Sequence, residues 1–121
     1  MKIQESAENY LEAIFVLSKS GSPVRSVDVA TRLGYSKPSV SVAMKKLKIE
    51  GYVVIASNGH LMLTQMGRDI AESMYERHML ISDWLVALGV DSQVATDDAC
   101  RIEHVISEES FEALRRHIKL L

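Results

Sequence analysis

The sequence has little of what marks several large classes of protein. It holds one cysteine and two prolines among 121 residues, which excludes an internal disulfide framework and fits a reducing cytosol. No apolar run approaches the roughly 18 residues of a membrane span, and the first residues lack the basic stretch and apolar core of a secretory signal. We therefore expect a cytoplasmic chain with no leader and no membrane partner. Because only seven residues are aromatic, a partner chain is expected to complete the core.

The remaining composition is that of a globular chain, with an uneven distribution of charge. Apolar residues make up 47% and charged residues 25%, which excludes wholesale disorder. The net charge of −2 hides +3 over residues 1–64 and −5 over residues 65–121. Six basic and two acidic residues fall within 25–50. This asymmetry predicts a basic contact surface in the first half of the chain.

Two short helices joined by a tight turn are predicted within residues 26–50. Ser26 and Ser36 are expected to cap their N-termini, Gly34 stands where a left-handed C-cap belongs, and Pro38 falls in the first turn of the second helix. Such a pair indicates a helix-turn-helix.

A hairpin is predicted directly after this pair. YVVIA (52–56) and HLMLT (60–64) flank an Asn-Gly turn, the strongest short hairpin signal. Helical spacing of apolar residues predicts the other helices, over 5–19, 65–88, Asp91 or Thr96 to 106, and 107–121. We therefore expect a mainly α fold: an N-terminal winged helix-turn-helix with a two-stranded β wing, followed by an α-helical dimerisation segment.

The exposed side of the second short helix has the chemistry of a DNA-reading surface. Small hydroxyl side chains and lysines near a helix N-terminus can reach base edges and phosphates in the major groove. A lysine-rich helix face can also be merely solvated, but here it lies on the second helix of a capped pair that a ribbon follows. The predicted DNA-binding residues are Arg25, Arg32, Ser36, Lys37, Pro38, Ser39, Ser41, Val42, Lys45, Lys46, Asn58 and His60.

A second constellation presents metal ligands on one helix face. Cys100, Glu103 and His104 stand at i, i+3 and i+4, so a thiol, a carboxylate and an imidazole share one side. Residues on two other predicted helices, His78 and the pair Asn9 and Glu12, could converge on them. Mixed oxygen, nitrogen and sulfur donors suit a divalent transition metal.

Two other interpretations of C-x-x-E-H remain open. Cys100 could be a small buried hydrophobe beside a solvated Glu103 and a satisfied His104, and the Glu-Arg-His string around His78 could lie on the surface. A catalytic role is not expected, because Cys100 and His104 have no evident orienting group or oxyanion element.

The two constellations, in this order, resemble the diphtheria-toxin-repressor family of metal-dependent transcriptional repressors, which includes the manganese-transport regulators. The matching strings are ENYLEAIFVL, SVDVATRLGYSKPSVSVAMKKL, GYV and LTQMGR around the predicted wing, ERHMLISDWLVALGV and DDACRIEHVIS. The resemblance implies a winged-helix DNA-binding domain at 1–64 and a helical metal-binding and dimerisation domain at 65–121. The expected form is the short one, without the SH3-like domain of longer members.

The resemblance also implies a role for individual residues. The C-x-x-E-H residues match the family's metal-binding helix, His78 matches the ligand on the long helix, and Glu12 matches the second first-helix ligand of the manganese branch. Asn9 departs from the pattern, because the manganese branch has Asp there and the iron branch Met. Cys100 follows the iron branch, which favours Fe2+ slightly over Mn2+.

We accordingly expect a metal-dependent repressor of Fe2+ or Mn2+ uptake genes, not an enzyme, that binds an inverted-repeat operator as a homodimer. The metal is expected to link the first helix to the later ones and so fix the spacing of the two recognition helices. The alternative is a winged-helix regulator that is metal-independent or senses oxidants through Cys100.

Overall fold

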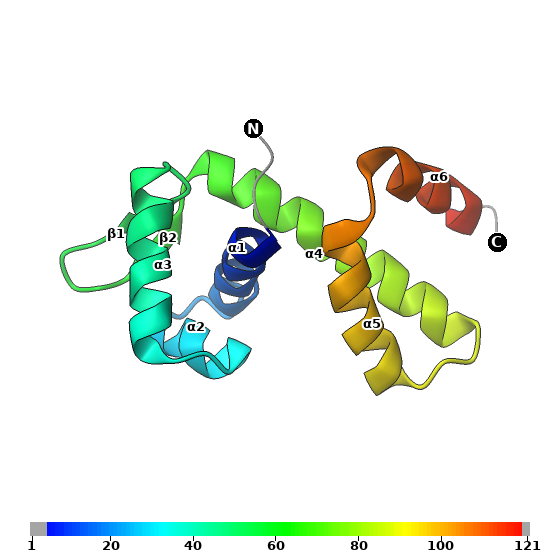
Figure 1. Ribbon diagram of the computed structural model, residues 1–121, viewed down its shortest axis with the longest axis horizontal. Coiled ribbons are helices and arrows are strands. Elements are labelled where there is room, and N and C mark those ends of the chain that lie inside the picture. Colours follow the sequence, from blue (N-terminus) through cyan, green and yellow to red (C-terminus); the bar gives the residue numbers. More distant parts are fainter. Residues whose placement is uncertain (1–4, 120–121) are drawn as a thin grey trace. The chain divides into compact units, whose positions relative to one another are not determined.

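The computed structural model describes residues 5–119, and the ends of the two predicted domains, residues 1–4 and 120–121, lie outside the described residues. Over this range the chain forms six helices and one two-stranded antiparallel sheet (Figure 1). The elements in chain order are α1 (Glu5–Ser18), α2 (Ser26–Leu33), α3 (Lys37–Ile49), β1 (Val53–Ile55), β2 (Leu61–Leu63), α4 (Gln65–Ala87), α5 (Ser92–Val105) and α6 (Glu108–Lys119). The mainly α fold class with a β wing is confirmed.

The chain divides into two units, residues 1–72 and 73–121, with the boundary inside α4. The predicted boundary at residues 64 and 65 coincides instead with the start of α4. No helix of the described chain is long and apolar enough to cross a bilayer.

The helix-turn-helix is set by local capping chemistry. Ser36 caps α3, accepting a 3.2 Å hydrogen bond from the Ser39 backbone N–H, and Pro38 lies in the first turn as expected. Gly34 ends α2 in the left-handed region, with φ of 72°. Glycine adopts this conformation without strain because it has no Cβ. The predicted cap of α2 was wrong by one residue, because helix geometry already begins at Ser26. The N-cap is Arg25, whose backbone N–H donates to the Asp28 carboxylate at 2.9 Å.

The wing is shorter than predicted. Val53 pairs with Leu63 and Ile55 with Leu61, so each strand loses its end residues from the expected five. The flanking residues keep single cross-strand bonds, from the Thr64 N–H to the Tyr52 carbonyl at 3.1 Å and from the Ala56 N–H to the His60 carbonyl at 2.9 Å. The ladder does not extend through Tyr52, because its N–H donates to the Leu47 carbonyl in the last turn of α3. At its turn end, where β2 begins, the hairpin is anchored by a 2.7 Å hydrogen bond from the Leu61 N–H to the Val24 carbonyl.

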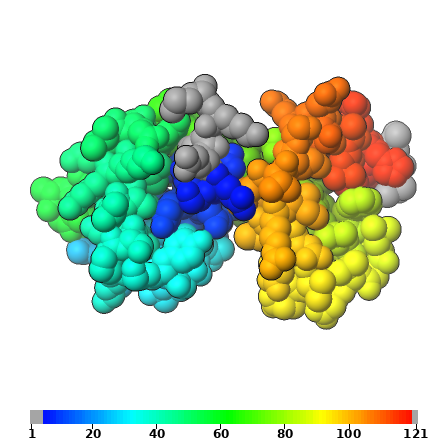
Figure 2. Space-filling model, viewed as in Figure 1, coloured from blue at the N-terminus to red at the C-terminus, as the bar shows by residue number. Residues whose placement is uncertain are grey.

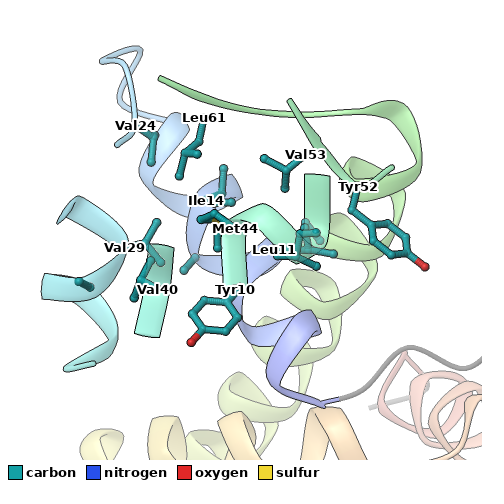
Figure 3. Close-up of a cluster of buried hydrophobic side chains, with 14 residues drawn as sticks. Tyr10, Leu11, Ile14, Val24, Val29, Val40, Met44, Tyr52, Val53 and Leu61 are labelled. Atoms are coloured by element: carbon teal, nitrogen blue, oxygen red, sulfur yellow. The ribbon is translucent and has the colours of Figure 1, made fainter. Parts of the chain in front are cut away.

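Apolar side chains from α1, α2, α3 and both strands form the core of unit 1. Leu11 and Ile14 of α1 lie between Val29 and Val40 of the helix pair and Val53 of the wing (Figure 3). All five are at most 2% exposed. At the edge of this core, burial raises the pKa of the Tyr10 phenol, and the nearby Tyr35 adds to the rise. The core therefore fixes α3 and the wing to the same helix, α1.

Thr64 joins the wing to α4. Its hydroxyl donates to the Gly51 carbonyl at 2.7 Å and accepts from the Gly67 N–H at 3.2 Å, capping α4 as predicted. Gly67 lies against the Tyr52 carbonyl so closely that a Cβ there would overlap the oxygen. The start of α4 is thereby fixed on unit 1.

In unit 2, α5 and α6 pack on the second half of α4. Ile81, Ala99 and Phe111 form its buried centre, each at most 2% exposed. The Asp91 carboxylate caps α5, and the Ser107 hydroxyl caps α6 by accepting the Ser110 N–H at 3.0 Å. Of the two starts proposed for α5, Asp91 is therefore the correct one.

Candidate functional site

The outer side of α3 is a basic surface on unit 1. Val40, Met44 and Leu47 turn inward, which leaves the lysines and small polar residues outward. Figure 2 shows the blue-green atoms of α3 along the visible face of this unit. Val42, in the middle of the helix, is 68% exposed. Ser41 is half-buried, and the other predicted α3 residues are exposed, namely Lys37, Pro38, Ser39, Lys45 and Lys46.

The wing turn is tied down by its own side chains. The Asn58 carbonyl oxygen accepts the His60 N–H at 3.2 Å, and the Asn58 amide nitrogen lies 3.2 Å from the His60 Nδ1. A guanidinium nitrogen of Arg25 would lie 3.6 Å from a Cβ at Gly59, so Arg25 reaches the hairpin turn. Arg25, Asn58 and the cap residue Ser36 are exposed, as is Arg32 on α2, whereas His60 is half-buried.

The predicted ligand face of α5 is folded against α4 in unit 2. The Glu103 carboxylate is fully buried, with one oxygen 3.0 Å from His78 Nδ1 and the other 3.3 Å from His104 Nε2. The His104 side chain is 1% exposed and that of His78 is 20% exposed. Cys100, one turn earlier on α5, is half-buried. Glu103 is therefore not a solvated acid, and His78 is not a freely exposed surface residue.

A buried carboxylate between two imidazoles has the donor chemistry of a metal centre. A carboxylate removed from water is costly unless a positive partner compensates it. Protonated imidazole can supply that charge, and so can a divalent ion held by the same oxygen and nitrogen atoms. A thiol at the next turn adds the softer donor that transition metals accept.

The two remaining predicted ligands lie on α1 in unit 1. Asn9 is half-buried and Glu12 is 9% exposed. Standing three residues apart, they share one side of the helix. Leu11 and Ile14 on the same helix belong to the core of unit 1, so the backbone that carries both donors is held rigidly within that unit.

Sequence reasoning missed the side chain beside His78. Arg77 is half-buried and donates from Nη1 to the carbonyls of Glu103 at 3.1 Å and Ile106 at 3.0 Å. A signal was present, because Arg77 stands at helical spacing between the buried Met74 and Ile81. A charged residue within an apolar stripe needs a partner.

Both units match family models. Residues 2–61 match the N-terminal DNA-binding domain of the iron-dependent repressors, and residues 64–120 match their metal-binding and dimerisation domain. The chain belongs to the iron-dependent repressor family. The resemblance that the sequence motifs indicated is confirmed.

Individual relatives are named as a transcriptional regulator and a repressor. The chain is 35% identical over 112 residues to the transcriptional regulator MntR of Escherichia coli, covering 93% of this chain and 72% of that one. It is also 35% identical over 118 residues to the diphtheria toxin repressor of Corynebacterium diphtheriae, covering 97% and 51%. Members of this repressor family are transcriptional regulators.

Solved structures share the fold. A manganese-dependent transcriptional repressor in complex with manganese matches with a TM-score of 0.86 at 29% identity, over 95% of this chain and 53% of that one. The manganese regulator SloR matches with a TM-score of 0.83 at 28% identity, over 98% and 55%. This family member thus spans about half the length of those two structures.

Proposed function

We propose that this chain is a metal-dependent DNA-binding repressor that controls metal-ion homeostasis. The observation that carries the proposal is the buried Glu103 carboxylate between His78 and His104, in the unit that matches a metal-binding domain. The DNA-binding part of the proposal is supported by the exposed basic side of α3, which lies in the unit that matches a DNA-binding domain.

The ligand set that we propose is drawn from α1, α4 and α5. Charged or soft donors come from Glu12, Glu103 and Cys100, and imidazoles from His78 and His104, with the Asn9 amide oxygen as a neutral sixth donor. A bound divalent ion would supply the positive charge that compensates these carboxylates and the thiolate. The Cys100 thiolate favours Fe2+ slightly over the harder Mn2+.

Repression would follow from a change in the freedom of the DNA-binding unit. Glu12 belongs to the helix that also carries the core contacts of α3 and the wing. If Glu12 and Glu103 serve one centre, the recognition helix loses orientations that it samples without metal. DNA then no longer has to select the minor population of chains in which the recognition helix is correctly oriented. A coupling free energy of about 1–3 kcal/mol per site between metal binding and DNA binding suffices.

We further propose a homodimer on an inverted-repeat operator. Ile81 and Phe111 are already covered within unit 2 and need no partner chain. Exposed apolar side chains remain on this unit, notably Leu88 at 62% and Val105 at 73%. A two-fold pair would present two α3 helices to successive major grooves. Sedimentation at micromolar concentration should give twice the chain mass, and a monomer there would contradict the dimer.

The experiment that tests the function begins with a pool of random-sequence duplexes, enriched on the full chain in the presence of Mn2+. Binding of the enriched duplex is then titrated with the apo chain and with Fe2+, Mn2+ or Zn2+ added. Stimulation by metal supports the proposal. Equal binding with and without metal favours the metal-independent or oxidant-sensing alternative, and absence of DNA binding in every condition overturns both.

A further inference from the structure

Arg77 of α4 binds the C-terminal end of α5. The carbonyls of the last turn of a helix lack partners within the helix, and two carbonyls at this end, those of Glu103 and Ile106, accept hydrogen bonds from the Arg77 guanidinium at 3.1 and 3.0 Å. A cation at a helix C-terminus is also favoured by the helix dipole. Arg77 therefore holds the end of α5 against α4.

The same guanidinium packs on α6. Its Cζ lies 5.1 Å from the ring centroid of Phe111, which is 2% exposed. Arg115 of α6 also lies over this ring, at 5.2 Å, but its ion pairs are with Glu76 on α4 and Glu112 on α6. Both arginines contact Phe111, and Arg77 is the one that also binds the α5 carbonyls.

Two consecutive residues of α4 thus bind Glu103, one at its backbone carbonyl and the other at its side-chain carboxylate. Arg77 binds its backbone carbonyl, and His78 binds its carboxylate at 3.0 Å. The carbonyl bonds restrict the position of the α5 backbone, and with it the place where the carboxylate meets the imidazole. His104 is the next residue on that backbone, so its ring is fixed by the same restraint.

We propose that Arg77 is a positioning residue for the metal centre, holding the last turn of α5 so that Glu103 and His104 face His78 before metal arrives. This inference rests on the proposed function of the centre. Groups that orient metal ligands commonly change metal affinity by 10- to 100-fold when removed. Arg77 acts on a ligand through its backbone, so we expect the lower end of that range.

Charge alone predicts the opposite result. A guanidinium close to a cation site repels the incoming ion, so a neutral residue at position 77 would strengthen metal binding if repulsion were the main effect. A positioning role predicts weaker binding. The direction of the change therefore separates the two explanations.

The test compares three variants of the full chain by Co2+ titration. Arg77→Met should bind Co2+ about tenfold more weakly than wild type, or about 1.4 kcal/mol, with a changed ligand-field absorption spectrum. Arg77→Lys keeps the charge but loses the planar fork and the flat contact with Phe111, so an intermediate loss is expected. Arg115→Met is the matched control, because it removes an arginine from the same ring without touching the α5 carbonyls, and its Co2+ affinity and spectrum should stay those of wild type.

Unfolding temperatures of the apo variants are measured alongside, so that lost stability is not mistaken for lost positioning. Unchanged or tighter Co2+ binding by Arg77→Met overturns the inference, as does an equal loss in Arg115→Met. If Arg77→Met does not fold, Arg77→Lys decides, and wild-type affinity in that variant overturns the inference. If the wild-type chain itself does not bind Co2+, the proposed function is overturned and this inference with it. If the wild-type chain binds Co2+ and Arg77→Met binds it with the same affinity, only the inference is overturned.

Discussion

Replacing Lys45 with alanine should change how steeply DNA affinity falls with salt. Lys45 is exposed on the outer side of α3 and is one of five exposed basic residues predicted to bind DNA, with Arg25, Arg32, Lys37 and Lys46. Each basic side chain that contacts a phosphate releases counterions and adds about −0.9 to the slope of log affinity against log salt. For a dimer with all five in contact on each side, the slope is about −9.

Lys45→Ala removes one contact from each protomer, so the slope should become shallower by about 1.8. Between 200 and 50 mM salt, the ratio of wild-type to variant affinity should therefore grow about twelvefold. Fluorescence anisotropy with the metal-loaded chain and a labelled enriched duplex measures both slopes. The control is Lys119→Ala, which removes another exposed lysine, on α6, and should leave the slope unchanged.

An unchanged slope in Lys45→Ala would show that this lysine contacts no phosphate. Equal effects of the two substitutions would mean that the DNA-facing surface is not α3. An equal loss of affinity at every salt concentration would instead indicate that Lys45 acts through an uncharged contact or through the fold.

Three further changes test the metal centre and the scaffold. Glu103→Ala or His104→Ala should abolish metal-stimulated DNA binding, with circular dichroism and weak non-specific binding retained; a full metal response in either variant would contradict the ligand assignment. Gly67→Ala should destabilise unit 1 by about 1–3 kcal/mol, because its Cβ would overlap a backbone oxygen, and a wild-type denaturant midpoint would show that α4 can shift freely. Ser36→Ala should cost about 1 kcal/mol by removing the α3 cap, measured by thermal unfolding, whereas Ser36→Asp should restore most of it.

The helix-turn-helix could be predicted because its signals are local. Ser36, Pro38 and Gly34 act on backbone groups within three or four residues, so their positions in the sequence fix the ends of α2 and α3. The start of α2 was missed by one residue because Arg25 caps through its backbone N–H rather than through a capping side chain. Its partner Asp28 supplies the oxygen from inside the helix.

Only those parts of the site that depend on side-chain spacing along a helix could be predicted from the sequence. The i, i+3, i+4 pattern placed a carboxylate and an imidazole on one face of α5, and the structure brings His78 to them. Arg77 could not be assigned a partner, since its acceptors are backbone carbonyls 26 and 29 residues further along. Every residue has a backbone carbonyl, so the residue types in the sequence do not indicate which carbonyls accept a hydrogen bond.

The anchor at the turn end of β2 limits which residues of the wing can move. The 2.7 Å hydrogen bond from the Leu61 N–H to the Val24 carbonyl ties β2 to the segment before α2, while the turn around Asn58 is held by bonds within the turn itself. Conformational entropy lost on docking is therefore confined to a few tip residues and does not extend into the strands. Slow amide exchange at Leu61 and faster exchange in the turn around Asn58, measured in the absence of DNA, would be the sign of this division. If α3 reads DNA as we propose, a wing built in this way would follow the sugar-phosphate contour of different sequences without disturbing that helix.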